Sequence, residues 1–192
     1  MKATELRDQS ILPDLSEHLK KIKEISGGSS DLLINEIEIC GIRTALICCE
    51  GMVSTATMTE LILHPLMNLK LENPSPASLF HKIENRMLLS VDRPVAYNYE
   101  DFFRLLNSGF AMLAADGQDS VLAFGVQGYD KRGVDEPSGE NNITGSHDGF
   151  VEVIRSNMSL IRRRMKSPVL VQKLFVICLL YTSPSPRDRQ KS

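Results

Sequence analysis

One apolar run, Ile42–Cys49, limits most strongly what this chain can fold into. A strand with one face in water alternates apolar and polar residues, whereas this run is apolar almost throughout, as expected of a strand that is buried on both faces. The segment before it, residues 32–39, alternates glutamate and isoleucine in its second half, and Cys40-Gly41 separates the two segments. We therefore expect a β-hairpin whose second strand lies inside a sheet.

Helical periodicity on both sides of this hairpin predicts helices that cover the sheet. Apolar residues recur at three- and four-residue spacing over residues 12–25. A second helix should begin at Ser54 or Thr55, and Pro65 should kink or divide it because proline has no amide hydrogen. A third helix should follow the Asn-Pro-Ser-Pro segment at residues 73–76.

The next part of the sequence supplies one more helix and two more strands. Asn98 should cap a short helix over residues 99–106. Residues 110–115 and 120–126 are apolar runs on either side of an Asp-Gly pair, which is typical of a hairpin turn. The order of elements predicts an α/β fold, with α+β as the alternative: a small mixed sheet of about four strands layered with helices, then a long helix and the start of a second α/β subdomain.

The long helix should follow a polar loop at residues 128–145. Ser146 and Asp148 can cap and charge its start, and its basic end suits the negative end of the helix dipole. The residues that we expect on its buried, apolar side are Phe150, Val153, Ile154, Leu160 and Ile161.

These patterns divide the chain into five parts. Residues 1–28 form an N-terminal helical segment, and residues 29–145 form a first α/β subdomain. Residues 146–167 form a long connecting helix, and residues 168–177 are the start of a truncated second subdomain. Residues 178–192 are a non-native tail. The first eleven residues of the tail resemble, codon for codon, the translation of a common transposase sequencing adapter. A disordered tail rich in serine, proline and arginine is the weaker alternative. The apolar residues before the tail then form a strand without a partner, so we expect the native protein to continue into another α/β segment.

Charge and hydropathy exclude several classes of function. The net charge of -2 at pH 7 provides no general basic surface of the kind that binds nucleic acid. No apolar run reaches the ~20 residues that a membrane span needs. The first ten residues carry charges where a signal peptide is apolar. We therefore expect no nucleic-acid partner, and neither a membrane span nor a secretion signal in the chain as given.

The cysteines and histidines lack the spacing of a metal site or of a catalytic motif. We predict no catalytic residue, no cofactor and no metal, and we interpret Cys48 and Cys49 as buried, reduced thiols that point to opposite faces of a strand. One alternative stays open. It is a small-molecule-binding or hydrolytic site near Glu50, in which Cys48 or Cys49 acts with His64 or His81.

One block of residues matches a known pattern, formed by an acidic loop, a helix start and a basic helix end. Its members are Glu136-Pro137-Ser138-Gly139-Glu140, Gly145, Gly149-Phe150, Asn157, Leu160-Ile161-Arg162-Arg163-Arg164-Met165-Lys166 and Pro168. This block resembles the GerA family, the A subunits of the nutrient germinant receptors of bacterial spores. The resemblance spans residues 12–177 and includes Ser30-Asp31-Leu32. It departs from the family around Gly145, where Thr144 and Ser146-His147-Asp148 replace an arginine and a Pro-Arg-Glu segment.

The resemblance implies a non-enzymatic receptor component. In the family, the soluble N-terminal domain comprises two α/β subdomains, and several membrane helices follow this domain. The A subunit acts with B and C subunits. We therefore expect the full-length protein in the spore inner membrane, with this domain on the cytoplasmic (spore core) side. Other A subunits and the B and C subunits are the expected partners, and nutrient signal transmission or receptor assembly is the expected role. The resemblance identifies neither the nutrient nor the subunit that binds it.

The basic end of the long helix is the main candidate for an interaction site. Arg162, Arg163 and Arg164 are about 100° apart on a helix and so cannot all face one partner. If Ile161 and Met165 face the core, Arg163 and Arg164 should project into solvent. Arg162 should then lie closest to acidic groups. Its planar guanidinium can bind a carboxylate with two hydrogen bonds. A solvated helix end is the alternative. The candidate acids for Arg162 lie in the loop, at Asp135, Glu136 and Glu140.

The remaining candidate residues come from the family pattern and from helical spacing. Asn157 falls between Ile154 and Ile161, so we expect it on the buried side, bonded to backbone. The residues assigned to a signature or interaction role by the resemblance are Glu136, Pro137, Gly149, Phe150, Asn157, Arg162, Arg163 and Arg164.

Overall fold

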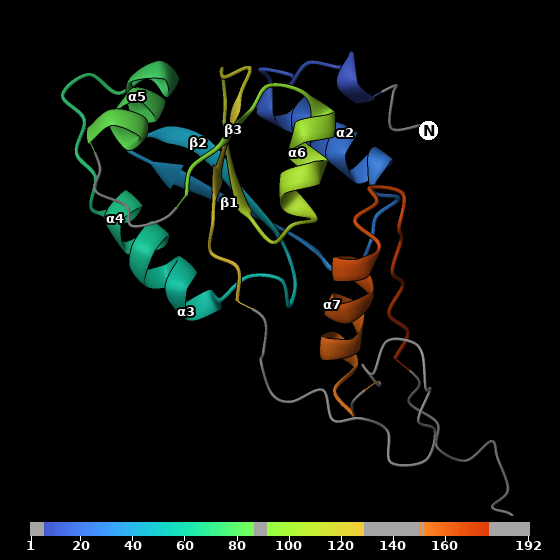
Figure 1. The fold of residues 1–192 in the computed structure, drawn as a ribbon. Coiled ribbons are helices and arrows are strands. Elements are labelled where there is room, and N and C mark those ends of the chain that lie inside the picture. The colour runs from blue at the N-terminus through green and yellow to red at the C-terminus, as the bar shows by residue number, and fades with distance from the viewer. Residues whose placement is uncertain (1–5, 87–91, 129–149, 151, 177–192) are drawn as a thin grey trace, which may run out of the picture.

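The computed structural model describes residues 6–86, 92–128, 150 and 152–176, and Figure 1 shows one sheet with helices packed around it. The strands are β1 (Leu32–Ile39), β2 (Ile42–Cys49), β3 (Val95–Ala96), β4 (Ala111–Ala115) and β5 (Val121–Phe124). The helices are α2 (Leu15–Ile25), α3 (Thr55–Met58), α4 (His64–Met67), α5 (Pro76–Arg86), α6 (Tyr99–Leu106) and α7 (Ile154–Arg164), with a π-helical turn, η1 (Thr59–Leu63), between α3 and α4.

The strands form one antiparallel sheet in the order β1-β2-β4-β5-β3. Both predicted hairpins are present, and β2 lies between β1 and β4, which confirms the predicted central strand. The layered helix and sheet architecture is also confirmed. The described sheet differs from the prediction in having five strands rather than about four and in being antiparallel throughout rather than mixed. The additional strand, β3, has only two residues, which is too short to produce a periodic pattern in the sequence.

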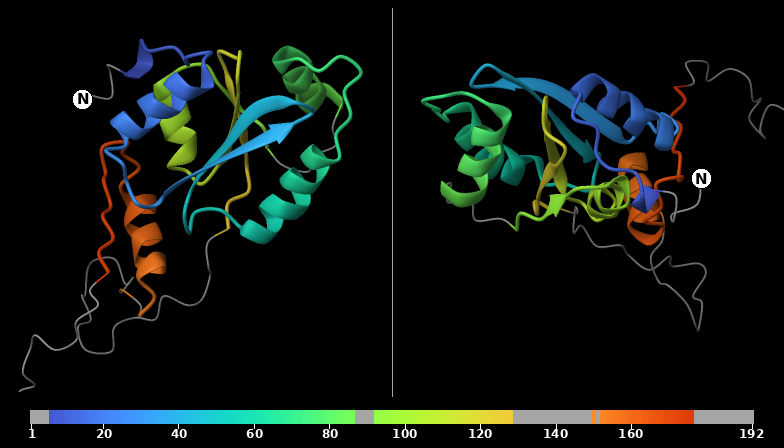
Figure 2. Two further views of the ribbon diagram at one scale, coloured as in Figure 1. Left: turned by 180° about the vertical axis from the view of Figure 1, so that it is seen from behind. Right: turned by 90° about the horizontal axis from the view of Figure 1, so that it is seen from above.

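The sheet separates two apolar cores because successive residues of a strand point to opposite faces. Helices α2 and α6 cover one face, where Ile22 and Phe102 are fully buried. Helices α3 to α5 cover the other face, where Ile62 and Leu79 are fully buried. Figure 2 shows the two helical layers on opposite sides of the strands.

The helices begin and deform where the sequence predicts. Ser54 and Asn98 accept backbone hydrogen bonds from Thr57 and Asp101 and so cap α3 and α6. Pro65 has no amide hydrogen to donate to the preceding turn, and the helix widens just before it. There the His64 N–H bonds to the Thr59 carbonyl five residues back, which is the π-helical spacing.

The C-terminal part departs from the prediction. Helix α7 runs from Ile154 to Arg164 rather than over 146–167, and Val153 precedes it without a side-chain cap. Ser146 and Asp148, the predicted capping residues, lie outside the described residues. Residues 169–176 run without regular secondary structure, in place of the predicted strand. This segment contacts the turn before β1 and not a strand: the backbone N–H of Ser30 donates to the Gln172 carbonyl at 2.8 Å.

A histidine and a tyrosine form a buried polar pair within the first core. His18 on α2 is 1% exposed, and its Nδ1 lies 2.9 Å from the Tyr99 hydroxyl on α6. Phe102 packs edge-on against the imidazole, with ring centroids 5.6 Å apart. Burial lowers the pKa of His18 to about 4, because a charged imidazolium is poorly solvated there.

This pair predicts a pH-dependent stability. Between pH 6.5 and 4 the unfolded chain binds a proton on His18 that the folded chain does not, so stability should fall as the pH falls through this window. Between pH 6.5 and 5 the loss should be about 2 kcal/mol, as measured by denaturant unfolding. A His18→Gln variant, which places a neutral hydrogen-bonding amide at the site, should lose most of this pH dependence. An equal pH dependence in the variant would contradict the assignment.

Candidate functional site: a buried arginine on helix α7

Arg162 is buried and forms a two-pronged ion pair with Asp31. The guanidinium donates from Nε to Asp31 Oδ2 and from Nη2 to Asp31 Oδ1, both at 2.8 Å. The two side chains are 4% and 2% exposed. A lysine could not make both bonds, because its single ammonium lacks the planar fork of the guanidinium. The acid that binds Arg162 thus precedes β1, whereas the acidic loop with Asp135, Glu136 and Glu140 lies outside the described residues.

Polar groups from the same loop as Asp31 and from two further segments surround this ion pair. Arg162 Nη2 also donates to Ser29 Oγ at 3.1 Å, and Nη1 lies 3.3 Å from the Ser167 carbonyl and 3.5 Å from Asn107 Oδ1. Ser29 Oγ in turn donates to Asp31 Oδ1 and accepts the backbone N–H of Gln172 at 2.8 Å. The network joins the loop before β1, the end of α6, α7 and the segment after α7. Buried charges with this many hydrogen bonds are protected from the penalty of an unpaired charge.

Helix α7 faces the sheet domain with its polar side. Arg155 Nη1 donates to Glu50 Oε1 at 2.7 Å, and Ser159 packs on Gly51, where an added Cβ would lie 3.1 Å from the serine Cβ. Residues 155, 159 and 162 are spaced by four and three positions and therefore form one stripe. Gly51 has φ +73°, so any other residue would be strained here as well as crowded.

The apolar side of α7 is not turned to the core as predicted. Phe150, Val153, Ile154 and Met165 are 74%, 58%, 57% and 55% exposed. Leu160 and Ile161 are half-buried. Helices α2 and α6 already cover the first core, and the residues of α7 that are buried against the domain are the polar Ser159 and Arg162.

The other predicted interaction residues are placed differently from Arg162. Arg164 is exposed, as expected, whereas Arg163 is half-buried. Asn157 is also half-buried, and its backbone N–H bonds to the Val153 carbonyl at 3.3 Å. Glu136, Pro137 and Gly149 lie outside the described residues.

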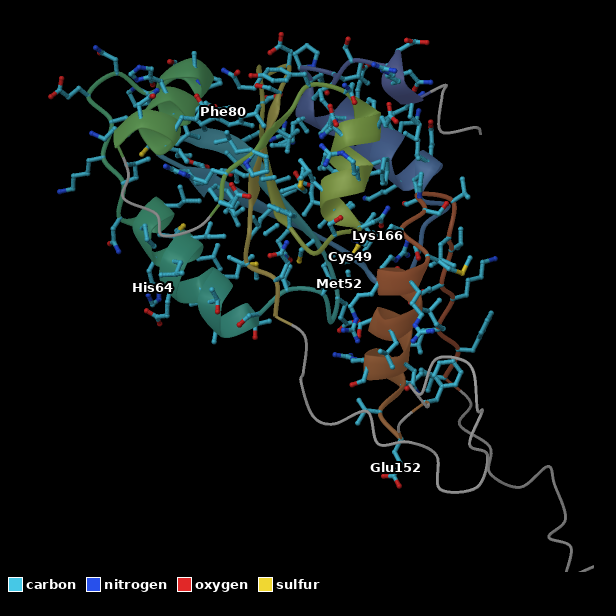
Figure 3. The ribbon with its side chains drawn as sticks, in the orientation of Figure 1. Cys49, Met52, His64, Phe80, Glu152 and Lys166 are labelled. Carbon is cyan, nitrogen blue, oxygen red and sulfur yellow. The ribbon has the colours of Figure 1, made fainter. Side chains whose placement is uncertain are left out.

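The alternative thiol site does not assemble in the described part of the chain. Cys48 and Cys49 are buried in opposite cores, and burial raises the pKa of the two thiols to about 11 and about 12. His64 is exposed, lies 3.5 Å from Glu60, and is far from Cys49 in Figure 3. Glu50 pairs with Arg155 instead of a histidine. A buried thiol of raised pKa is a poor nucleophile, so the two cysteines pack as small apolar side chains.

Two other kinds of site are absent from the described residues. Within these residues, no group of three or more histidine, cysteine, aspartate or glutamate side chains is arranged to hold a metal ion. In the same part of the chain, no helix is long and apolar enough to cross a membrane.

Comparison with known proteins places the chain in a family. The family model described as Bacillus/Clostridium GerA spore germination protein matches residues 20–178. The chain belongs to the GerA family. It is 31% identical over 168 residues to spore germination protein KA of Bacillus subtilis and 28% identical over 167 residues to spore germination protein B1 of the same organism. These matches cover 85% and 83% of this chain, and 30% and 33% of the relatives.

A solved structure shares this fold. The N-terminal domain of the A subunit of the Bacillus megaterium spore germinant receptor GerK3 matches with a TM-score of 0.63 and 26% identity, over 83% of this chain and 58% of that chain. The described fold is therefore that of an N-terminal domain of a GerA-family A subunit. An uncharacterized membrane protein, YfkQ of Bacillus subtilis, is also similar, at 27% identity over 168 residues. The chain spans about a third of the length of these curated relatives.

The packing of the thiols gives a prediction. Cys48→Ala and Cys49→Ala should each lower the free energy of unfolding by about 1 kcal/mol, because each removes one buried sulfur from a close-packed core. Denaturant unfolding measures this loss. In a full-length receptor that carries this domain, germination should persist in both variants. Complete loss of germination in a normally abundant, normally folded Cys→Ser receptor would instead indicate thiol chemistry.

Proposed function

We propose that this chain is the first part of the soluble domain of a germinant-receptor A subunit, and that it transmits the nutrient signal or supports receptor assembly without catalysing a reaction. The receptor would include other A subunits with B and C subunits. In the full-length protein, membrane helices would follow and anchor it in the spore inner membrane, with this domain on the cytoplasmic (spore core) side. Residues 29–145 would form the first subdomain and residues 168–177 the start of a second.

The observation that carries this proposal is the Arg162–Asp31 ion pair. It joins two segments that separately resemble the family, Ser30-Asp31-Leu32 and the Leu160 to Lys166 block. The pair fixes where α7 leaves the sheet domain. Whatever follows α7 in the longer relatives would therefore take its orientation from this contact, which is the property that a signal-transmitting or assembling junction requires.

The partly exposed apolar stripe on α7 supports the same role. Ile154 and Met165 stand out from the sheet domain, and Phe175 and Val176 are 78% and 83% exposed. Contiguous exposed apolar patches mark interaction surfaces, and these side chains would contribute to such a patch. We propose that the second subdomain or a neighbouring A subunit covers them.

Arginine substitution in a full-length receptor tests the proposal. Arg162→Lys keeps the charge but loses the two-pronged bond, so the germination rate, followed as the fall in optical density after nutrient addition, should drop at least fivefold. Arg163→Lys should impair germination less. Receptor abundance in the spore membrane, measured by immunoblot, separates a signalling defect from an assembly defect.

Lys166→Gln is the matched control, because Lys166 is exposed just beyond the same helix. This receptor should germinate at the normal rate. Normal assembly and germination of both Arg162→Lys and Arg163→Lys receptors would show that neither arginine is needed for signalling or assembly, and the proposal would fail.

A further inference from the structure

Strand β1 is an edge of the sheet, and its outer side has no neighbouring strand among the described residues. In the order β1-β2-β4-β5-β3 it comes first, and all eight of its residues pair with β2. In the left view of Figure 2, β1 lies in front of the other strands, between α2 on one side and α3 to α5 on the other, and no helix crosses it. Such an edge offers a row of backbone N–H and C=O groups to a further strand.

Two hydrogen bonds establish which backbone groups of β1 point outward. The Asp31 carbonyl accepts the Glu50 N–H at 2.7 Å. The Ile37 carbonyl accepts the Thr44 hydroxyl at 2.9 Å. The odd-numbered residues thus direct their backbone groups toward β2. The even-numbered residues direct theirs to the outer edge, because the direction alternates along an antiparallel strand.

The open part of this edge has a defined length. At its start, the Ser30 N–H donates to the Gln172 carbonyl at 2.8 Å. The Leu32 N–H donates to the Ser29 carbonyl at 3.2 Å. At its far end, the chain turns into β2 at Cys40, which has φ +53°. The outward N–H groups without a hydrogen-bond partner among the described residues are those of Ile34, Glu36 and Glu38.

We propose that β1 pairs with β1 of a second copy of this chain, in an antiparallel arrangement centred on Asn35 that joins the two sheets into one. A two-fold axis at Asn35 places Ile34 opposite Glu36 of the second copy, and Glu36 opposite Ile34. Each of these pairs exchanges two backbone hydrogen bonds. Glu38 donates its N–H to the Leu32 carbonyl of the second copy. This contact is self-complementary, as the interface of a two-fold dimer must be.

Charge and the length of the open edge select this register. A pairing centred on Glu36 would place two glutamates directly opposite each other, which is destabilising. A pairing centred on Ile34 would bring Glu38 of one copy to Ser30 of the other, where the edge is already occupied. With Asn35 at the centre, each glutamate of β1 lies opposite a leucine or an isoleucine, and the pairing ends before Ser30.

The side chains of β1 also favour this register. On the face covered by α3 to α5, Leu33 of one copy lies opposite Ile37 of the other. Leu33 is 39% exposed and Ile37 is half-buried, so the pairing covers apolar surface that the single chain leaves in water. On the other face, Glu36 keeps its ion pair with Arg43 at 3.4 Å, which offsets repulsion between the glutamates of the two copies.

The proposed pairing and the proposed function stand on different observations. That the pairing joins two A subunits in the receptor rests on the proposed function. The pairing itself rests only on the open edge of β1, and it is measured on the chain alone.

The first test is the mass of the full chain in solution, measured by size-exclusion chromatography with light scattering at several concentrations. The unsubstituted chain should approach twice the mass of one chain. Glu36→Pro removes an outward N–H and leaves the bonds to β2 in place, because proline is tolerated on an edge strand where its nitrogen faces outward. This variant should be monomeric. Glu36→Gln, the matched control, loses the same charge but keeps the N–H, and it should remain dimeric.

The second test measures the register by disulfide cross-linking. In Asn35→Cys the two new cysteines lie opposite each other in a non-hydrogen-bonded pair, with Cα atoms about 4.5 Å apart, which is within reach of a disulfide. In Leu33→Cys, a control on the same face of the same strand, they are four residues out of register, or ~14 Å apart. Asn35→Cys should therefore form a reducible dimer at least tenfold faster than Leu33→Cys, after subtraction of the rate for the unsubstituted chain.

Two results would overturn the pairing. One is cross-linking of Asn35→Cys no faster than that of Leu33→Cys. The other is a dimer that a folded Glu36→Pro chain retains, because such a dimer would use another surface. If Glu36→Pro loses its circular dichroism spectrum, the two cysteine variants decide the matter, since both positions are exposed. None of these measurements depends on germination, so failure of the pairing and failure of the proposed function are distinguishable.

Discussion

Asp31 and Arg162 are 131 positions apart in the chain, and both are almost completely removed from water. Charges in such a position require a partner with matching geometry, and the two parallel hydrogen bonds at 2.8 Å supply it. The pair determines the direction in which α7 leaves the domain, and its hydrogen-bonded neighbours tie down the segment that follows. The placement of α7 thus depends in large part on one guanidinium and one carboxylate, beside the Arg155–Glu50 pair and the hydrogen bonds of Ser29.

The rest of the domain is held together by a different kind of force. Strand β2 is apolar on both faces, so it is stable only between two helical layers, and α2 and α6 on one side and α3 to α5 on the other provide them. The domain thus combines an apolar body with a buried ion pair that attaches α7 to it.

Most of the body could be predicted from the sequence because the signals are local. The apolar run of β2, the caps at Ser54 and Asn98, and the helix deformation before Pro65 each arise from residues within one turn or one strand. The burial of the cysteines followed from the same run. Strand β3 was missed because two residues contain no periodicity.

The site could be predicted only in part, because its contacts are distant in sequence. A planar guanidinium beside an apolar stripe indicated that Arg162 would bind a carboxylate, but nothing local pointed to Asp31. Asp31 could have been identified from its position in Ser30-Asp31-Leu32, the second segment that resembles the family. The burial of α7 was predicted with the wrong face inward, since periodicity identifies an apolar stripe without showing whether a core remains for it to cover. Ile154 and Met165 are exposed for that reason.

The central claim is that Asp31 and Arg162 act as one unit that positions α7, and a double-mutant cycle tests it most directly. Hydrogen exchange of the α7 amides would be measured in the unsubstituted chain, Asp31→Asn, Arg162→Gln and the double variant. The account predicts a coupling free energy above about 2 kcal/mol, larger than that of exposed ion pairs, with the double variant close to either single one. Effects that add to within about 0.5 kcal/mol would contradict it.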